Sequence, residues 1–132
     1  MIVEPLEAAE LIVMRGLQFA GRCETHELPF FGVAHLGYVP KRRRLDGDEL
    51  AAELERRARV AQRQEQLTSA VSDWMVDQYA PLGVALVLEA EHACHERRGA
   101  AGRETKVVTA QFRGVLRHDA PLRAEFLSRV RR

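Results

Sequence analysis

The pattern of hydrophobic and polar positions divides this chain into strand-like and helix-like segments. Residues 11–20 and 30–39 are rich in β-branched and aromatic side chains, a composition typical of strands. Arg15-Gly16 interrupts the first segment, and we expect a β-bulge there. Because the two strands follow each other closely, they are predicted to pair antiparallel, with residues 23–26 in the turn that joins them.

Between residues 46 and 80 the hydrophobic pattern has the period of helices, three to four residues. A first helix is predicted to begin at Asp46 or Asp48, either of which can cap its N-terminus. A second, more apolar helix is predicted to end at residues 80–83. The expected inward-facing residues are Leu50, Leu54, Ala58, Ala61, Leu67, Val71, Trp74, Met75 and Tyr79.

The strand pattern returns in the last third of the chain. Residues 84–90 are almost continuously apolar, and residues 106–116 alternate as a fourth strand. Asp119 is the predicted N-cap of a final helix with Leu122, Phe126 and Val130 on its apolar side. The order β-β-α-α-β-β-α predicts an α+β fold in a single domain, residues 1–132. We expect a four-stranded antiparallel sheet with helices on one face plus a C-terminal helix, and its open edges favour pairing with further subunits.

Composition limits the function classes. The 132 residues carry a formal net charge of +1, which argues against a nucleic-acid binder because such domains are usually strongly basic. No apolar run approaches the ~20 residues of a membrane span, and residues 1–7 lack the features of a secretory signal. We therefore expect a cytoplasmic protein. Its two cysteines then suit metal binding or catalysis better than a disulfide.

Two short stretches, residues 23–26 and 92–95, hold both cysteines and three of the five histidines. Zinc binds thiolate and neutral imidazole readily, and catalytic zinc sites commonly use three protein ligands and one water. The candidate ligands are Cys23, His26 and Cys94. This set leaves His92 beside the metal, where an imidazole can donate and accept protons. Zinc would lower the pKa of its bound water toward neutrality.

The same residue types also permit a structural zinc site. If His92 or His95 completed a closed tetrahedral set, the metal would stabilise the fold without catalysis. The spacing alone favours neither alternative. The other histidines have simpler interpretations, because His35 is predicted to be a strand residue with a hydrogen-bond partner and His118 a surface residue.

Several stretches form motifs that occur in a fixed order. Residues 23–40 read Cys-Glu-Thr-His-Glu-Leu-Pro-Phe-Phe-Gly, then His-Leu-Gly-Tyr-Val-Pro, and residues 62–68 read Gln-x-Gln-Glu-x-Leu-Thr. Further motifs stand at residues 89–94, 98–99, 106–109 and 123–127. Together they resemble the GTP cyclohydrolase I family, whose signature includes Cys-Glu-His-His-x-x-Pro-Phe-x-Gly and Gln-x-Gln-Glu-Arg-Leu-Thr. The resemblance covers roughly residues 10–130, and the N-terminal helical region typical of the family has no counterpart in this sequence.

The resemblance implies the tunnelling fold (T-fold), whose units assemble into oligomeric barrels with active sites between subunits. The expected assembly is a homo-oligomer, a pentamer or decamer. The resemblance also makes Cys23, His26 and Cys94 the ligands of a Zn²⁺ cofactor. His92 matches the family's catalytic histidine, which handles protons at the imidazole ring of the purine.

The implied substrate-binding residues are Gln64 and Glu65, which match residues that recognise the guanine edge, and Arg98 in the pocket. One departure from the family lies in the same site. Thr25 stands where the family has the first histidine of its His-His pair, so one active-site imidazole is missing. His95 is a candidate replacement for it.

A second departure concerns the phosphates. The family's Ser-Lys-x-x-Arg triphosphate clamp falls on Asp48, Glu49 and Ala52, and the two carboxylates would repel a triphosphate. We therefore expect a zinc-dependent hydrolase that opens the imidazole ring of a guanine-type purine by attack of zinc-bound water at C8. Its substrate is expected to be a base or nucleoside without a triphosphate.

Two alternatives stay open. One is authentic GTP cyclohydrolase I activity, which makes dihydroneopterin triphosphate, with Arg22, the basic residues 41–44 or a neighbouring subunit in place of the clamp. The other is a catalytically silent T-fold protein that binds a purine or pterin. In each case the expected partner is a small molecule, with no nucleic acid and no membrane.

Overall fold

The computed structural model describes residues 10–24, 28–92 and 106–131. These residues form a four-stranded sheet in the order β1-β2-β3-β4, in which every neighbouring pair is antiparallel. The strands are β1 (Ile12–Arg22), β2 (Pro29–Val39), β3 (Gly83–His92) and β4 (Lys106–Gly114). The helices are α1 (Gly47–Ala58), α2 (Gln64–Tyr79), α3 (Val115–His118) and α4 (Ala120–Val130). None of the helices within these ranges is long and apolar enough to cross a membrane.

The predicted order of strands and helices is confirmed, with one difference after β4. The fourth strand ends at Gly114, and residues 115–118 form the short helix α3 instead of continuing the strand. Gly114 has a φ of +62°, a conformation that glycine adopts readily. A Cβ at this position would lie 2.2 Å from the backbone oxygen of Leu82. The close approach of Leu82 therefore turns the chain out of the sheet earlier than the alternation predicted.

The N-caps of α1 and α4 are the residues predicted from the sequence. The Asp46 carboxylate accepts a hydrogen bond from the backbone N–H of Asp48 at 2.9 Å and begins α1. The Asp119 carboxylate does the same for Leu122 at 3.1 Å and begins α4. Ala61, which was expected to continue the inward face of α1, lies beyond the end of that helix.

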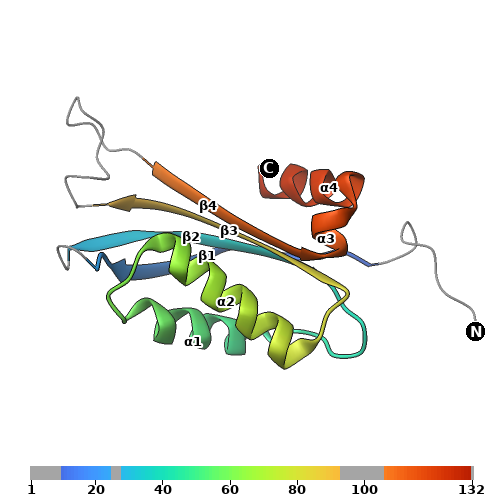
Figure 1. The fold of residues 1–132 in the computed structure, drawn as a ribbon, viewed down its shortest axis with the longest axis horizontal. Helices are drawn as coiled ribbons and strands as arrows, with labels where there is room; N and C mark the ends of the chain where they lie inside the picture. Colours follow the sequence, from blue (N-terminus) through green and yellow to red (C-terminus); the bar gives the residue numbers. More distant parts are fainter. Residues whose placement is uncertain (1–9, 25–27, 93–105, 132) are drawn as a thin grey trace, which may run out of the picture.

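The sheet carries a separate hydrophobic core on each face, because successive side chains of a strand point to opposite faces. Figure 1 shows α1 and α2 on one face and α3 and α4 on the other. The larger core lies under α1 and α2 and includes Phe30, Leu36, Leu67, Met75 and Leu86. The smaller core lies under α3 and α4 and includes Val39, Ala85, Val87, Leu116 and Phe126. The predicted C-terminal helix thus covers the face opposite to the helix pair.

The predicted bulge in β1 is present, and His35 accepts a hydrogen bond from its backbone. The pairing register shifts between Met14 and Leu17, and Gly16 between them has a φ of +80°. Its backbone N–H donates to Nδ1 of His35 on β2 at 3.0 Å. The prediction of a hydrogen-bonded strand histidine is therefore confirmed. Burial lowers the pKa of His35, although the nearby Glu89 carboxylate opposes this effect.

We predict that the bulge makes stability depend on mildly acidic pH. Because the folded pKa of His35 lies below its ordinary value of about 6.5, the unfolded chain takes up the proton first as the pH falls. This contribution to the free energy of unfolding is complete above about pH 6.5. It is lost progressively from there down to the folded pKa, since protonated Nδ1 cannot accept the Gly16 hydrogen bond.

The variant His35→Asn offers an amide oxygen near the Nδ1 position but does not titrate. Urea unfolding between about pH 5 and 8 should therefore show a weaker pH dependence for this variant than for the wild type. Equal pH dependence in the two proteins would contradict the prediction.

Candidate metal and catalytic site

The register of the sheet brings the two cysteine-containing segments to the same end. β1 and β3 both pair antiparallel with β2, so they run in the same direction. Phe30 of β2 pairs with Gly21 on one side and with His92 on the other. Cys23 and Cys94 lie two residues beyond Gly21 and His92 in the sequence. The strands that precede them in the sequence therefore end on either side of the first residues of β2.

The turn that follows β1 is closed by Cys23, whose backbone N–H donates to the backbone oxygen of Leu28 at 2.9 Å. Cys23 is partly exposed. Thr25 and His26 fall inside this turn but lie outside the described residues.

A second set of contacts joins this turn to the segment between α1 and α2. The backbone oxygen of Arg22 accepts a hydrogen bond from the N–H of Gln62 at 2.9 Å. The Arg63 guanidinium donates to the Glu24 carboxylate at 2.8 Å. This hydrogen bond raises the pKa of Arg63, and the nearby Glu65 and Cys23 act in the same direction. The N-terminus of α2 is thus held beside Cys23.

His92 lies at the end of β3 between an aromatic ring and an amide. Its side chain is buried, and its ring stacks on Phe30 with 4.6 Å between ring centroids and 16° between the planes. Nε2 of His92 lies 2.7 Å from Oε1 of Gln64. Stacking on Phe30 therefore fixes the plane of the imidazole, and the contact with Gln64 fixes the position of Nε2.

Gln64 is the first residue of α2, and none of its surface is exposed to solvent (0%). Its amide nitrogen donates to the backbone oxygens of Leu88 at 3.1 Å and Val107 at 3.0 Å. The hydroxyl oxygen of Thr109 lies 3.1 Å from the same nitrogen. One side chain thus joins α2 to both β3 and β4. Glu65, the next residue, is exposed on the first turn of the helix.

The predicted site residues divide into two groups. Cys23, Gln64, Glu65 and His92 are described, and the elements above bring them to one end of the sheet. The others lie outside the described residues: Thr25, His26, Cys94, His95 and Arg98. Within the described ranges no group of three or more His, Cys, Asp or Glu side chains could hold a metal ion.

The described member of the predicted ligand set, Cys23, fits zinc. It is partly exposed at the end of β1, and thiolate is a ligand type that zinc prefers. The other two predicted ligands, His26 and Cys94, lie outside the described residues.

Two residues of this site were given no role from the sequence: Phe30, which stacks on His92, and Thr109, which contacts Gln64. Both stand in motifs that the sequence analysis identified. Their contacts depend on the cross-strand register, which residue spacing within one segment does not supply.

The first turn of α1, on which the family's triphosphate-clamp pattern falls, is acidic, and one of its carboxylates contacts other parts of the chain. The Glu49 carboxylate accepts a hydrogen bond from the Tyr79 hydroxyl and lies 3.9 Å from the Arg43 guanidinium. Arg43 also lies 4.4 Å from the centre of the Tyr79 ring and donates to the backbone oxygen of Gln78. Arg43 of the basic run is therefore committed to contacts within the chain.

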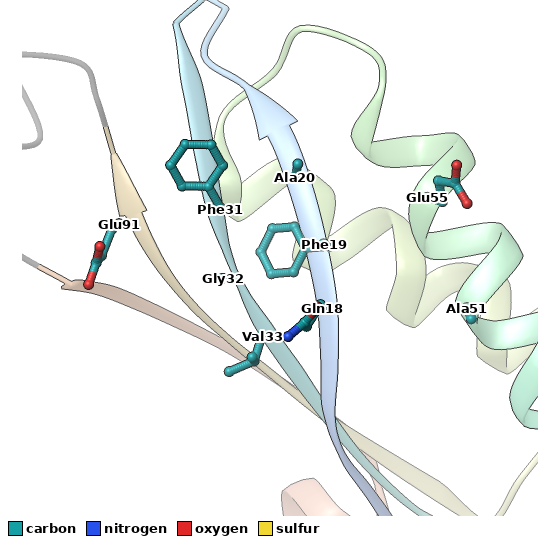
Figure 2. Close-up of a pocket in the computed structure, with 9 residues that line it drawn as sticks. All are labelled: Gln18, Phe19, Ala20, Phe31, Gly32, Val33, Ala51, Glu55 and Glu91. Atoms are coloured by element: carbon teal, nitrogen blue, oxygen red, sulfur yellow. The ribbon is translucent and has the colours of Figure 1, made fainter.

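A pocket of about 620 Å³ lies apart from the residues described above (Figure 2). Its lining residues come mainly from β1, β2 and α1: Gln18, Phe19, Ala20, Phe31, Gly32, Val33, Ala51, Glu55 and Glu91. Figure 2 shows Glu91 on one side of the two strands and Glu55 of α1 on the other. The volume suits a small ligand, but the pocket opens along an edge strand and contains none of the predicted site residues. We therefore base the site on the Cys23–His92 end of the sheet.

Solved structures with a similar fold define the class of this protein. The archaeosine synthase QueF-Like in its apo form matches with a TM-score of 0.59 and 15% identity, covering 76% of this chain and 92% of that chain. E. coli dihydroneopterin aldolase in complex with neopterin matches with a TM-score of 0.54 and 12% identity, covering 77% of this chain and 98% of that chain. These matches and the antiparallel sheet with its helices identify a T-fold, as the sequence predicted.

The chain belongs to the GTP cyclohydrolase I family, whose model matches residues 2–131. GTP cyclohydrolase 1 of Listeria monocytogenes serotype 4a (strain HCC23) is 39% identical over 123 residues, which are 92% of this chain and 65% of that protein. The enzyme of Halalkalibacterium halodurans is 42% identical over the same shares. That of Geobacillus kaustophilus is 40% identical over 126 residues, 95% of this chain and 67% of that protein. The chain thus spans about two thirds of the length of these relatives.

We predict that Gly21→Ala disturbs His92 through Phe30. A Cβ at Gly21 would lie 2.5 Å from Cζ of the Phe30 ring, so the ring that stacks on His92 has to move. Overpacking of this kind typically costs about 1–3 kcal/mol of unfolding free energy. The NMR signals of the His92 ring should shift at the same time.

Gly37→Ala is the matched control. Its Cβ would lie 2.3 Å from the Phe126 ring on the other face of the sheet, so it should destabilise to a similar extent. Unfolding measurements and NMR of both variants test the prediction, which fails if Gly37→Ala shifts the His92 signals as much as Gly21→Ala does.

Proposed function

We propose that this chain is a zinc-dependent hydrolase that opens the imidazole ring of a guanine-type purine at C8. The proposed substrate is a base or nucleoside without a triphosphate. The observation that carries the proposal is the fixed, buried imidazole of His92 at the end of the sheet where Cys23 leaves β1. Membership of the GTP cyclohydrolase I family supports the reaction class.

In this proposal Cys23, His26 and Cys94 hold one zinc ion. Zinc bound there would supply a water activated toward attack on C8 of the purine. The Cys23–Leu28 backbone hydrogen bond closes the ends of the turn, and the Arg63–Glu24 ion pair holds Glu24 near the N-terminus of α2.

His92 is the proposed catalytic residue, moving protons at the imidazole ring of the substrate. Stacking on Phe30 and the contact with Gln64 limit its motion, so little reorganisation is needed when a substrate binds. Glu65 is the proposed recognition residue for the guanine edge, because its carboxylate lies on the exposed side of α2 and can accept from adjacent N–H groups. Thr25, His95 and Arg98 complete the proposed substrate pocket.

The absence of a triphosphate from the proposed substrate follows from α1. Asp48 and Glu49 place two carboxylates in the first turn of that helix. Two of the basic residues that could replace the clamp form contacts within the chain: Arg43 contacts Tyr79 and Gln78, and Arg44 forms an ion pair with Glu10 at 2.6 Å. These contacts favour a substrate with little negative charge.

We further propose a homo-oligomer, a pentamer or decamer, with active sites between subunits. In the described sheet β1 and β4 are the edge strands, and each pairs with one neighbour only. Pairing between subunits would satisfy these edges and would cover the pocket that opens along β1. Analytical ultracentrifugation tests this assembly.

We predict that zinc-loaded protein converts guanine or guanosine at least about tenfold more efficiently, in kcat/KM, than GTP. Loss of purine absorbance measures ring opening. The variant Asp48→Ser/Glu49→Lys/Ala52→Arg restores the family's clamp pattern and should raise the use of GTP without raising that of guanosine.

Other outcomes of this assay decide between the alternatives. A fluorescent pterin formed from GTP by the wild type would favour authentic GTP cyclohydrolase I activity. Tight purine binding without turnover of any substrate would overturn the hydrolase proposal and favour a binding protein.

We predict that Cys23→Ala lowers the zinc content of the purified protein well below one ion per chain, because it removes one of two thiolate ligands. Elemental analysis after dialysis measures the zinc content. His118→Ala is the control, since His118 is an exposed histidine on α3. Unchanged zinc in Cys23→Ala, or an equal loss in the control, would contradict the proposed ligand set.

A further inference from the structure

The Gln64 amide can be placed in only one orientation. Its nitrogen lies within hydrogen-bonding distance of the backbone oxygens of Leu88 and Val107. Backbone oxygens only accept hydrogen bonds, and an amide oxygen also only accepts. A flipped amide would place its oxygen against two other acceptors in a fully buried position, where unpaired polar groups are costly.

Two threonine hydroxyls support the same orientation. Thr68 donates to the backbone oxygen of Gln64 at 2.8 Å, which uses its one proton. The contact of 2.7 Å between the Thr68 and Thr109 hydroxyls therefore has Thr109 as the donor. Thr109 has then used its own proton, so its hydroxyl oxygen presents only lone pairs to the Gln64 amide nitrogen 3.1 Å away, as the two backbone oxygens do.

This orientation determines the proton position on His92. Oε1 of Gln64 lies 2.7 Å from Nε2 of His92 and only accepts, so Nε2 carries a proton. In the neutral ring the lone pair is then on Nδ1.

We propose that Gln64 is a positioning residue that holds the His92 ring in the Nε2–H tautomer and in one orientation. The effect of this positioning on catalysis rests on the proposed function, whereas the tautomer does not. The inference gives Gln64 a role through His92 in place of the direct substrate contact that the family resemblance implies. Its complete burial supports this role, because a purine has no access to the amide.

The tautomer is tested by solid-state NMR of the full chain with ¹⁵N-labelled histidine, at alkaline pH where the ring is neutral. His92 signals are assigned by their loss in His92→Asn. In the wild type, Nε2 should show a directly bonded proton and Nδ1 the chemical shift of an unprotonated nitrogen. A proton on Nδ1 instead of Nε2 would overturn the inference with the wild type alone, whether or not any variant folds.

Gln64→Met is the test variant, because methionine has a similar length without the amide. A substantial population of the Nδ1–H tautomer should appear in this variant. Thr109→Val is the matched control, since it removes one contact of the amide nitrogen but leaves the two backbone acceptors and the bond to His92. It should keep the wild-type signals, and an unchanged tautomer in folded Gln64→Met would contradict the inference.

Kinetics with the purine that the wild type converts separate positioning from substrate binding. Gln64→Met should lower kcat by about 10- to 100-fold with little change in KM, since the general acid–base step loses its fixed geometry. A raised KM with unchanged kcat would instead identify Gln64 as a substrate contact and overturn the inference. If the wild type shows the predicted tautomer but converts no purine, the proposed function fails while the assignment of the tautomer stands.

Discussion

The antiparallel register around Phe30 is the constraint on which the rest of this structure depends. Phe30 pairs with Gly21 on β1 and with His92 on β3, so two residues about seventy positions apart in the sequence lie on either side of the same β2 residue. The Phe30 ring packs over Gly21 and stacks on His92. A single β2 residue thus aligns the hydrophobic core, the turn with Cys23 and the proposed catalytic imidazole.

α2 provides polar contacts to the strands and to His92. Its first residue, Gln64, forms hydrogen bonds with backbone oxygens of β3 and β4 and with His92. The preceding residue, Arg63, forms an ion pair with Glu24 in the turn after β1. This surface ion pair is expected to contribute little to stability, whereas loss of the buried Gln64 amide would remove one hydrogen-bond partner each from the backbone oxygens of Leu88 and Val107.

Most of the fold could be predicted from the sequence because its signals are local. Alternation and β-branched residues identified the strands, Asp46 and Asp119 identified two helix starts, and Arg15-Gly16 identified the bulge. The predicted end of β4 was wrong. The observed end depends on the close approach of Leu82 to Gly114, which the alternation of residues within one strand does not reveal. In the site, the motifs indicated His92 and Gln64, but the hydrogen bond between them depends on how α2 packs against the sheet. The roles of all the predicted site residues stay predictions, and five of these residues lie outside the described part of the chain: Thr25, His26, Cys94, His95 and Arg98.

Gln64 contacts both the sheet and His92, and this limits which substitutions the α2 layer can tolerate. A substitution that shifts α2 against β3 and β4 moves the amide and the imidazole together, even when it lies far from any ligand. Substitutions in this layer should therefore disturb the orientation of the His92 imidazole as well as the packing of α2. The hydrophobic core under α4 contains none of the described site residues, so substitutions there should act mainly through packing.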